Sequence, residues 1–156
     1  METAADLVDE YIGQLKALYA DVRTWIHEHD PGTTIKPVTV EVIEEASGPY
    51  RAPGLEISRR GWPTHVRMEP VGRWIVGALG RVDMKSAMDT ETLVLIVPPG
   101  PIWTVEEHVG RAPASRRPRP VPAGALKWAW SENKLLGQYP PLTGKLFHKL
   151  LVSLTS

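Results

Sequence analysis

The sequence contains no cysteine and only one phenylalanine among its 156 residues. Without cysteine, the chain has no disulfide bond, no thiol nucleophile and no Cys-ligated metal or iron–sulfur cluster. Its longest unbroken apolar run, 93–97, is far shorter than the roughly 20 residues that cross a bilayer. The first residues, Met-Glu-Thr-Ala-Ala-Asp, have neither the basic nor the apolar region of a secretory signal. We therefore expect a cytoplasmic protein with no membrane segment.

The chain also lacks an excess of charge of either sign, since its formal net charge is zero. This balance argues against a general nucleic-acid coat protein, which carries a large positive excess. The two parts of the chain nevertheless differ: residues 1–50 carry ten acidic and three basic side chains, and residues 51–156 carry eight acidic and fifteen basic ones. Either a basic binding face or an acidic helix packed beside a basic sheet explains this difference. The second explanation is favoured because it needs no partner.

Composition and length indicate one globular domain that covers residues 1–156. Hydrophobic residues make up 42% and charged residues 23%, which is ordinary globular usage. The 15 prolines and 13 glycines predict many turns. Segment 110–124 contains four prolines and four arginines without any periodicity. Because such a segment buries too little apolar area to offset its ordering entropy, we expect a flexible loop there.

Two amphipathic helices are expected, one at each end of the domain. In Ala4–His29, apolar residues recur every three or four positions from Val8 to Ile26. Thr3 is the expected N-cap, and Asp30-Pro31-Gly32 ends the helix. Near the C-terminus, Thr143 is expected to cap a shorter helix with one apolar stripe, formed by Leu146, Phe147, Leu150, Leu151 and Leu154.

Between the helices, short segments with alternating or β-branched residues predict strands. They cover 38–43, 55–59, 65–69, 73–79, 81–84, 91–97 and 125–131. The turns between them are too short for helical crossovers, so the strands are expected to be antiparallel. The sequence thus predicts an α+β fold: a single twisted antiparallel sheet of six or seven strands, with both helices packed on one face.

The strongest catalytic candidate is Glu69 followed by Asp83-Met84-Lys85. Alternation along a strand puts Asp83 and Lys85 on one face, where two carboxylates can hold Mg²⁺ while the lysine orients the attacking water. This spacing resembles the PD-(D/E)xK core of metal-dependent nucleases, in which Glu56 is an alternative first acid and Glu10 a further ligand. The chain departs from that core, because its proline follows Glu69 instead of preceding the acid. A solvated ion pair before a turn explains the same residues.

The six tryptophans suggest a second possibility, a binder of single-stranded nucleic acid. Exposed tryptophans beside arginines stack on bases in such proteins. Alternatively, the indoles fill the space between sheet and helix, and each N–H finds a partner. We expect the second arrangement for Trp128 and Trp130, because both alternate with Leu126 on one side of a strand. Trp62, in a Gly-Trp-Pro turn, remains a candidate binding residue.

Arg116, Arg117 and Arg119 in the segment 110–124 are candidates for contact with phosphates or with an acidic protein surface. Their alternative is a solvated loop with no partner. No metal site is expected, because His27 and His29 point in opposite directions on a helix. No serine lies in a Gly-x-Ser-x-Gly elbow, and the glycines match no nucleotide-binding loop, so we expect no cofactor.

These observations favour a non-enzymatic binding or protein-interaction module over an enzyme. We expect a protein partner or self-association through the open sheet face and segment 110–124. A metal-dependent nuclease that uses Glu69, Asp83 and Lys85 is the alternative enzyme. A binder of single-stranded nucleic acid that uses Trp62 and nearby arginines is the third hypothesis.

Overall fold

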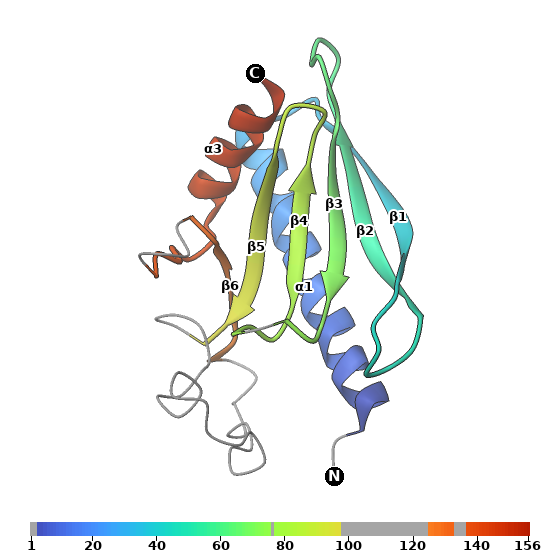
Figure 1. Ribbon diagram of the computed structural model, residues 1–156. Helices are drawn as coiled ribbons and strands as arrows, with labels where there is room; N and C mark the ends of the chain where they lie inside the picture. Colours follow the sequence, from blue (N-terminus) through green and yellow to red (C-terminus); the bar gives the residue numbers. More distant parts are fainter. Residues whose placement is uncertain (1–2, 76, 98–124, 133–136) are drawn as a thin grey trace.

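The computed structural model describes residues 3–75, 77–97, 125–132 and 137–156 as one sheet with two helices (Figure 1). Both α helices of the described residues lie on the same side of the sheet, and within those residues the other face carries no helix. The elements in chain order are α1 (Ala4–His29), β1 (Thr34–Val42), β2 (Tyr50–Ser58), β3 (Val66–Gly72), β4 (Arg81–Lys85), β5 (Thr90–Ile96), β6 (Lys127–Trp130) and α3 (Gly144–Thr155).

Helix α1 begins and ends where the sequence predicts. Thr3 forms a capping box, in which its hydroxyl accepts a hydrogen bond from the Asp6 N–H while Asp6 accepts one from the Thr3 N–H. At the other end, Asp30 is the C-cap, and Gly32 adopts a positive φ that turns the chain toward β1. One stripe of the helix is buried: Val8, Tyr11, Leu15, Leu18, Tyr19, Val22 and Ile26.

The strands form an antiparallel meander in sequence order, β1-β2-β3-β4-β5-β6. Each strand pairs with the next one in the chain, and the glycines of the first two turns, Gly48 and Gly61, have positive φ. The strand expected at 73–79 is wrong. Among the described residues of this range, Ile75 and Ala78 form an isolated bridge, and the chain turns back at Gly77, whose φ is positive.

The core lies between the helices and one face of the sheet. Met68 and Met84 are cross-strand partners whose side chains are fully buried in the same cluster as the apolar stripes of α1 and α3. The expected α+β fold, with one antiparallel sheet and two covering helices, is therefore confirmed, and the sheet has six strands. No helix in the described part of the chain is long and apolar enough to cross a bilayer. Segment 110–124 lies outside the described residues.

Substitution of two glycines by alanine tests this packing, because one substitution should stabilise the fold and the other should destabilise it. Gly13 is exposed on α1 with no atom within 4 Å of an added Cβ, so Gly13→Ala is expected to raise the free energy of unfolding by about 0.5–1 kcal/mol. At Gly54 on β2, an added Cβ would lie 2.8 Å from the Met68 carbonyl oxygen, so Gly54→Ala should lower the free energy of unfolding by roughly 1–3 kcal/mol. Urea unfolding of both variants measures the two changes, and shifts of the same sign would contradict the packing described.

Candidate functional site

The sheet face opposite the helices carries a lattice of charged side chains. Met68 and Met84 point into the core, and neighbouring residues on a strand point to opposite faces. The residues that alternate with these methionines therefore face away from the helices. Two rows of cross-strand partners lie on that face. The first row consists of Lys36, Glu56, Arg67, Lys85 and Thr90, and the second of Glu69, Asp83 and Thr92. We call these eight residues, together with Arg81, the open-face lattice.

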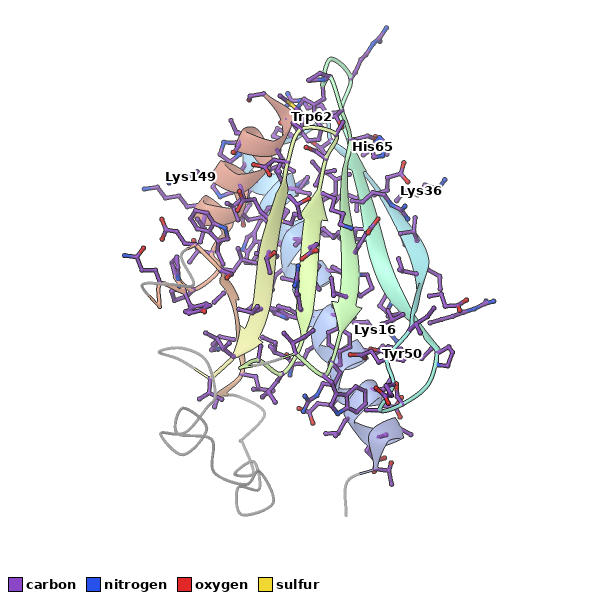
Figure 2. The ribbon with its side chains drawn as sticks, in the orientation of Figure 1. Lys16, Lys36, Tyr50, Trp62, His65 and Lys149 are labelled. Atoms are coloured by element: carbon purple, nitrogen blue, oxygen red, sulfur yellow. The ribbon has the colours of Figure 1, made fainter. Side chains whose placement is uncertain are left out.

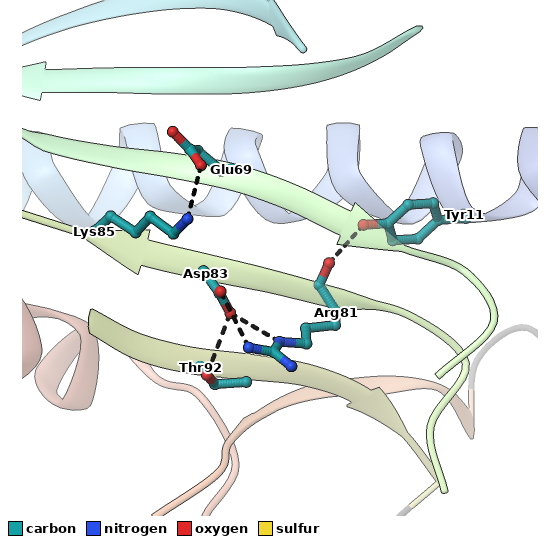
Figure 3. A network of polar contacts seen from close by, with 6 residues as sticks. All are labelled: Tyr11, Glu69, Arg81, Asp83, Lys85 and Thr92. Carbon is teal, nitrogen blue, oxygen red and sulfur yellow. Dashed lines mark hydrogen bonds and ion pairs between the residues drawn. The ribbon is translucent and has the colours of Figure 1, made fainter. Parts of the chain in front are cut away.

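The structure brings the three candidate nuclease residues together at the centre of this lattice. Glu69 on β3 and Asp83 on β4 are directly opposed, and the Lys85 Nζ atom lies 3.2 Å from a Glu69 carboxylate oxygen (Figure 3). The alternation of β4 puts Asp83 and Lys85 on one face, as the sequence predicts. Glu10 does not join them, because it is an exposed residue of α1 on the other side of the sheet.

Both carboxylates of this trio are already engaged by cations. Glu69 pairs with Lys85 and, at 3.5 Å, with Arg67. Asp83 accepts two hydrogen bonds from the Arg81 guanidinium, at 2.9 and 3.1 Å, and one from the Thr92 hydroxyl (Figure 3). In the described residues, no three potential ligands are placed to hold a metal ion. The arrangement is therefore that of a paired charge network rather than an open pair of carboxylates.

Asp83 is the most buried member of the lattice, with 5% of its surface exposed. Its partner Arg81 is held from the opposite side, because the Tyr11 hydroxyl donates a 2.6 Å hydrogen bond to the Arg81 carbonyl oxygen. Buried charge pairs of this kind require complete hydrogen bonding. Arg81 thus joins the buried surface of α1 to the charged face of the sheet, a role that nothing in the sequence indicated.

Four of the six tryptophans pack against the core. Trp128 and Trp130 pack against the core as expected, and their indole N–H groups donate to the Gln14 carbonyl oxygen and to the Glu91 carboxylate. Trp62 is half-buried and also packs against the core, near the end of the sheet opposite Tyr50 (Figure 2). Trp25 is a further core contact. These four indoles are therefore partly buried against the hydrophobic core.

A second polar cluster, not singled out in the sequence, lies at the loop between β1 and β2. The Glu44 carboxylate accepts hydrogen bonds from the Tyr50 hydroxyl and from the backbone N–H groups of Arg73 and Trp74. Gly72 leaves room for this carboxylate, since an added Cβ would lie 2.2 Å from a Glu44 oxygen. Glu44, Glu45, Ala46 and Trp74 line an open hollow of about 440 Å³. Because three donors satisfy Glu44, its main effect is to tie two loops together.

A third cluster joins the ends of the two helices. The Asp30 carboxylate, which is 5% exposed as a residue, lies 2.8 Å from Nδ1 of His148 on α3. The sequence suggested only that Asp30 ends α1, because its partner lies 118 positions away. Arg116, Arg117 and Arg119 lie outside the described residues, so the candidate binding segment that contains them is not placed relative to these clusters.

The paired state of Asp83 predicts a structural role that can be measured. Asp83→Asn leaves the Arg81 guanidinium without a charged partner and should lower the free energy of unfolding by about 1–3 kcal/mol. Lys85→Gln, at a side chain that is 47% exposed, should change it by less than about 1 kcal/mol. Urea unfolding compares the two variants. An unchanged value for Asp83→Asn would show that the fold does not need this carboxylate.

Because two tyrosines are buried, we expect the folded protein to lose stability at alkaline pH. Burial raises the pKa of Tyr11 and Tyr19 far above the ordinary value of 10.0, because the phenolate is poorly solvated there. The two tyrosines lose their protons at a lower pH in the unfolded chain than in the folded one. The free energy of unfolding is therefore unaffected below about pH 10 and falls as the pH rises further. We expect tyrosinate absorbance to appear together with loss of near-ultraviolet circular dichroism.

The matched control is Tyr19→Phe, which removes one of the two ionising groups and also the 2.7 Å hydrogen bond to the Pro53 carbonyl oxygen. Its free energy of unfolding should fall less steeply with pH above about pH 10, by up to roughly 1.4 kcal/mol per pH unit. An equal slope in both proteins would contradict the burial of the Tyr19 hydroxyl.

Comparison of the chain with protein-family models, with curated protein sequences and with solved structures gave no match. The function must therefore be inferred from the side chains described above. Of the three clusters, the open-face lattice is the most extended, and it lies on the face of the sheet away from α1 and α3.

Proposed function

We propose that this protein is a non-enzymatic interaction module that binds a protein partner through the open-face lattice. The proposal rests on the one-sided packing of the sheet, since α1 and α3 cover one of its faces (Figure 1). The register of β1 to β4 puts charged side chains on the other face. A face of this kind, with side chains held in register by the strands, is preorganised for binding.

The charge balance of the lattice favours a protein over a nucleic acid. Its members include four basic residues, Lys36, Arg67, Arg81 and Lys85, and three acidic ones, Glu56, Glu69 and Asp83. Nucleic-acid binding surfaces carry a clear positive excess that neutralises phosphates. Four of the six tryptophans, which would stack on bases in such a protein, are partly buried and pack against the core. Alternating charges suit a protein surface with the complementary pattern.

The pairing of the carboxylates favours binding over the nuclease alternative. A two-carboxylate metal site needs oxygen atoms that are free to approach the ion. In this chain Lys85 and Arg67 neutralise Glu69, and Arg81 neutralises Asp83. The nuclease hypothesis keeps the support of one observation, which is that Glu69 and Asp83 are directly opposed beside Lys85. Binding of a metal would require these ion pairs to break.

The partner is either a different protein or a second copy of the chain, and we place the complex in the cytoplasm. We also propose a second contact, in which Arg116, Arg117 and Arg119 bind an acidic part of the partner. The Glu44 hollow and the His148–Asp30 pair lie outside the lattice and take no part in this proposal.

Charge reversal on the lattice is the direct test. Lys85→Glu puts a like charge beside Glu69 on an exposed position and should weaken partner binding at least about tenfold. The matched control is Lys16→Glu, an exposed charge reversal on α1, on the helix side of the sheet. Chemical cross-linking in the expressing cell, followed by mass spectrometry, compares the partners of the three proteins. The mass of the purified chain at several concentrations tests self-association.

A partner that is lost with Lys85→Glu and kept with Lys16→Glu supports the proposal. Equal loss, or no loss, in both variants would move the binding surface off the lattice. Incubation of the wild-type chain with plasmid, single-stranded DNA and RNA, in Mg²⁺ or Mn²⁺, tests the enzyme directly. Metal-dependent cleavage that disappears in Asp83→Ala would replace the proposal with the nuclease.

A further inference from the structure

Two histidines from opposite ends of the chain lie beside each other where α1 meets α3. His29, in the last turn of α1, and His148, in α3, have ring centroids 5.8 Å apart, with their planes inclined by 34°. Two imidazoles bound to one tetrahedral Zn²⁺ ion, with Zn–N bonds of about 2.0–2.1 Å, have ring centres roughly 5 Å apart. A small rotation of the exposed His29 side chain covers this difference.

Asp30 gives His148 the orientation that a metal ligand needs. The Asp30 carboxylate is bound to Nδ1 of His148 at 2.8 Å, which leaves Nε2 as the nitrogen available to an ion. Metal-binding histidines commonly donate their second N–H to a carboxylate in this way, and the contact fixes both the tautomer and the ring. Asp30 is itself only 5% exposed, so it is held in place by the fold.

The two helices are held rigidly at this point. Trp25, one turn before His29, contacts Phe147 with ring centroids 5.7 Å apart. Gly144 at the start of α3 allows the approach, because an added Cβ would lie 2.6 Å from the Trp25 ring. The backbones that carry His29 and His148 are therefore fixed relative to each other by core packing. Preorganised ligands bind a metal with little loss of conformational entropy.

We propose that His29 and His148 form a binding site for a divalent transition metal ion such as Zn²⁺, with Asp30 as the orienting carboxylate. The ion takes Nε2 of His148 and one ring nitrogen of His29, and water completes its coordination. The divalent ion places a positive charge close to the buried Asp30 carboxylate. His27 is not part of the site, since residues two apart on a helix point in nearly opposite directions. The bound ion clamps the end of α1 to α3.

Calorimetric titration of the tag-free full chain with Zn²⁺ tests the site. The wild-type protein should bind one ion per chain, and the thermal unfolding midpoint should rise with the Zn²⁺ concentration. His29→Gln should abolish both effects without harm to the fold, because His29 is exposed. His148→Gln should also abolish Zn²⁺ binding and the rise of the unfolding midpoint, and Asp30→Asn should weaken binding by about 10–100-fold. His27→Gln, an equally exposed histidine of the same helix end, should bind as the wild type does.

The results separate cleanly because His29→Gln removes a ligand that makes no contact needed for folding. Zn²⁺ binding by His29→Gln equal to that of the wild type would overturn the proposal. So would equal losses in His27→Gln and His29→Gln, which would indicate loose association with both histidines at the end of α1. Absence of Zn²⁺, Ni²⁺ and Cu²⁺ binding by the wild-type chain would also overturn it.

Discussion

The structure depends on the burial of one face of the sheet beneath α1. A 26-residue helix is about 39 Å long, so its single apolar stripe crosses the width of the sheet and packs against several strands. Tyr11 illustrates the contact: its ring packs against Gly80, and its hydroxyl donates to the Arg81 carbonyl oxygen at the start of β4. Burial of this much apolar surface is the dominant favourable term in folding, and α3 adds a second apolar stripe to the same side.

This one-sided burial determines what the other face can do. Successive side chains of a strand point to opposite faces of the sheet. Met68 and Met84 point into the core, so the residues that flank them on β3 and β4 point to the face away from the helices. The chain fills these positions with charges of both signs, and cross-strand pairing neutralises them locally. The proposed function rests on this pattern of paired charges, which a protein surface with complementary charges would match. The same pairing occupies the carboxylates that a catalytic metal would need.

The contact between the two helices is a separate consequence of the same packing. Once α1 and α3 cover the same side of the sheet, Trp25 meets Phe147, and the next polar positions bring His29, Asp30 and His148 together. The open-face lattice and this histidine cluster are therefore independent features. One lies on the uncovered face of the sheet, and the other lies at the junction of the helices that cover the opposite face.

The sequence by itself determined the elements whose signals are local. The Thr3 and Asp30 boundaries of α1, the Thr143 cap of α3 and the antiparallel α+β architecture all follow from capping residues, hydrophobic period and short turns. It also placed Asp83 and Lys85 on one face, because strand alternation is a local property. The strand expected at 73–79 failed because the Gly77 turn and the Glu44 carboxylate, 29 and 30 positions from the amides that it binds, shape that segment.

Only the tertiary structure decided which groups meet. Trp62 could be placed against the core only when its neighbours were known. His148 reaches Asp30 across 118 positions because both helices pack on one face of the sheet. Such contacts have no signature in the order of the residues, since the free energy that forms them comes from the burial of distant apolar side chains.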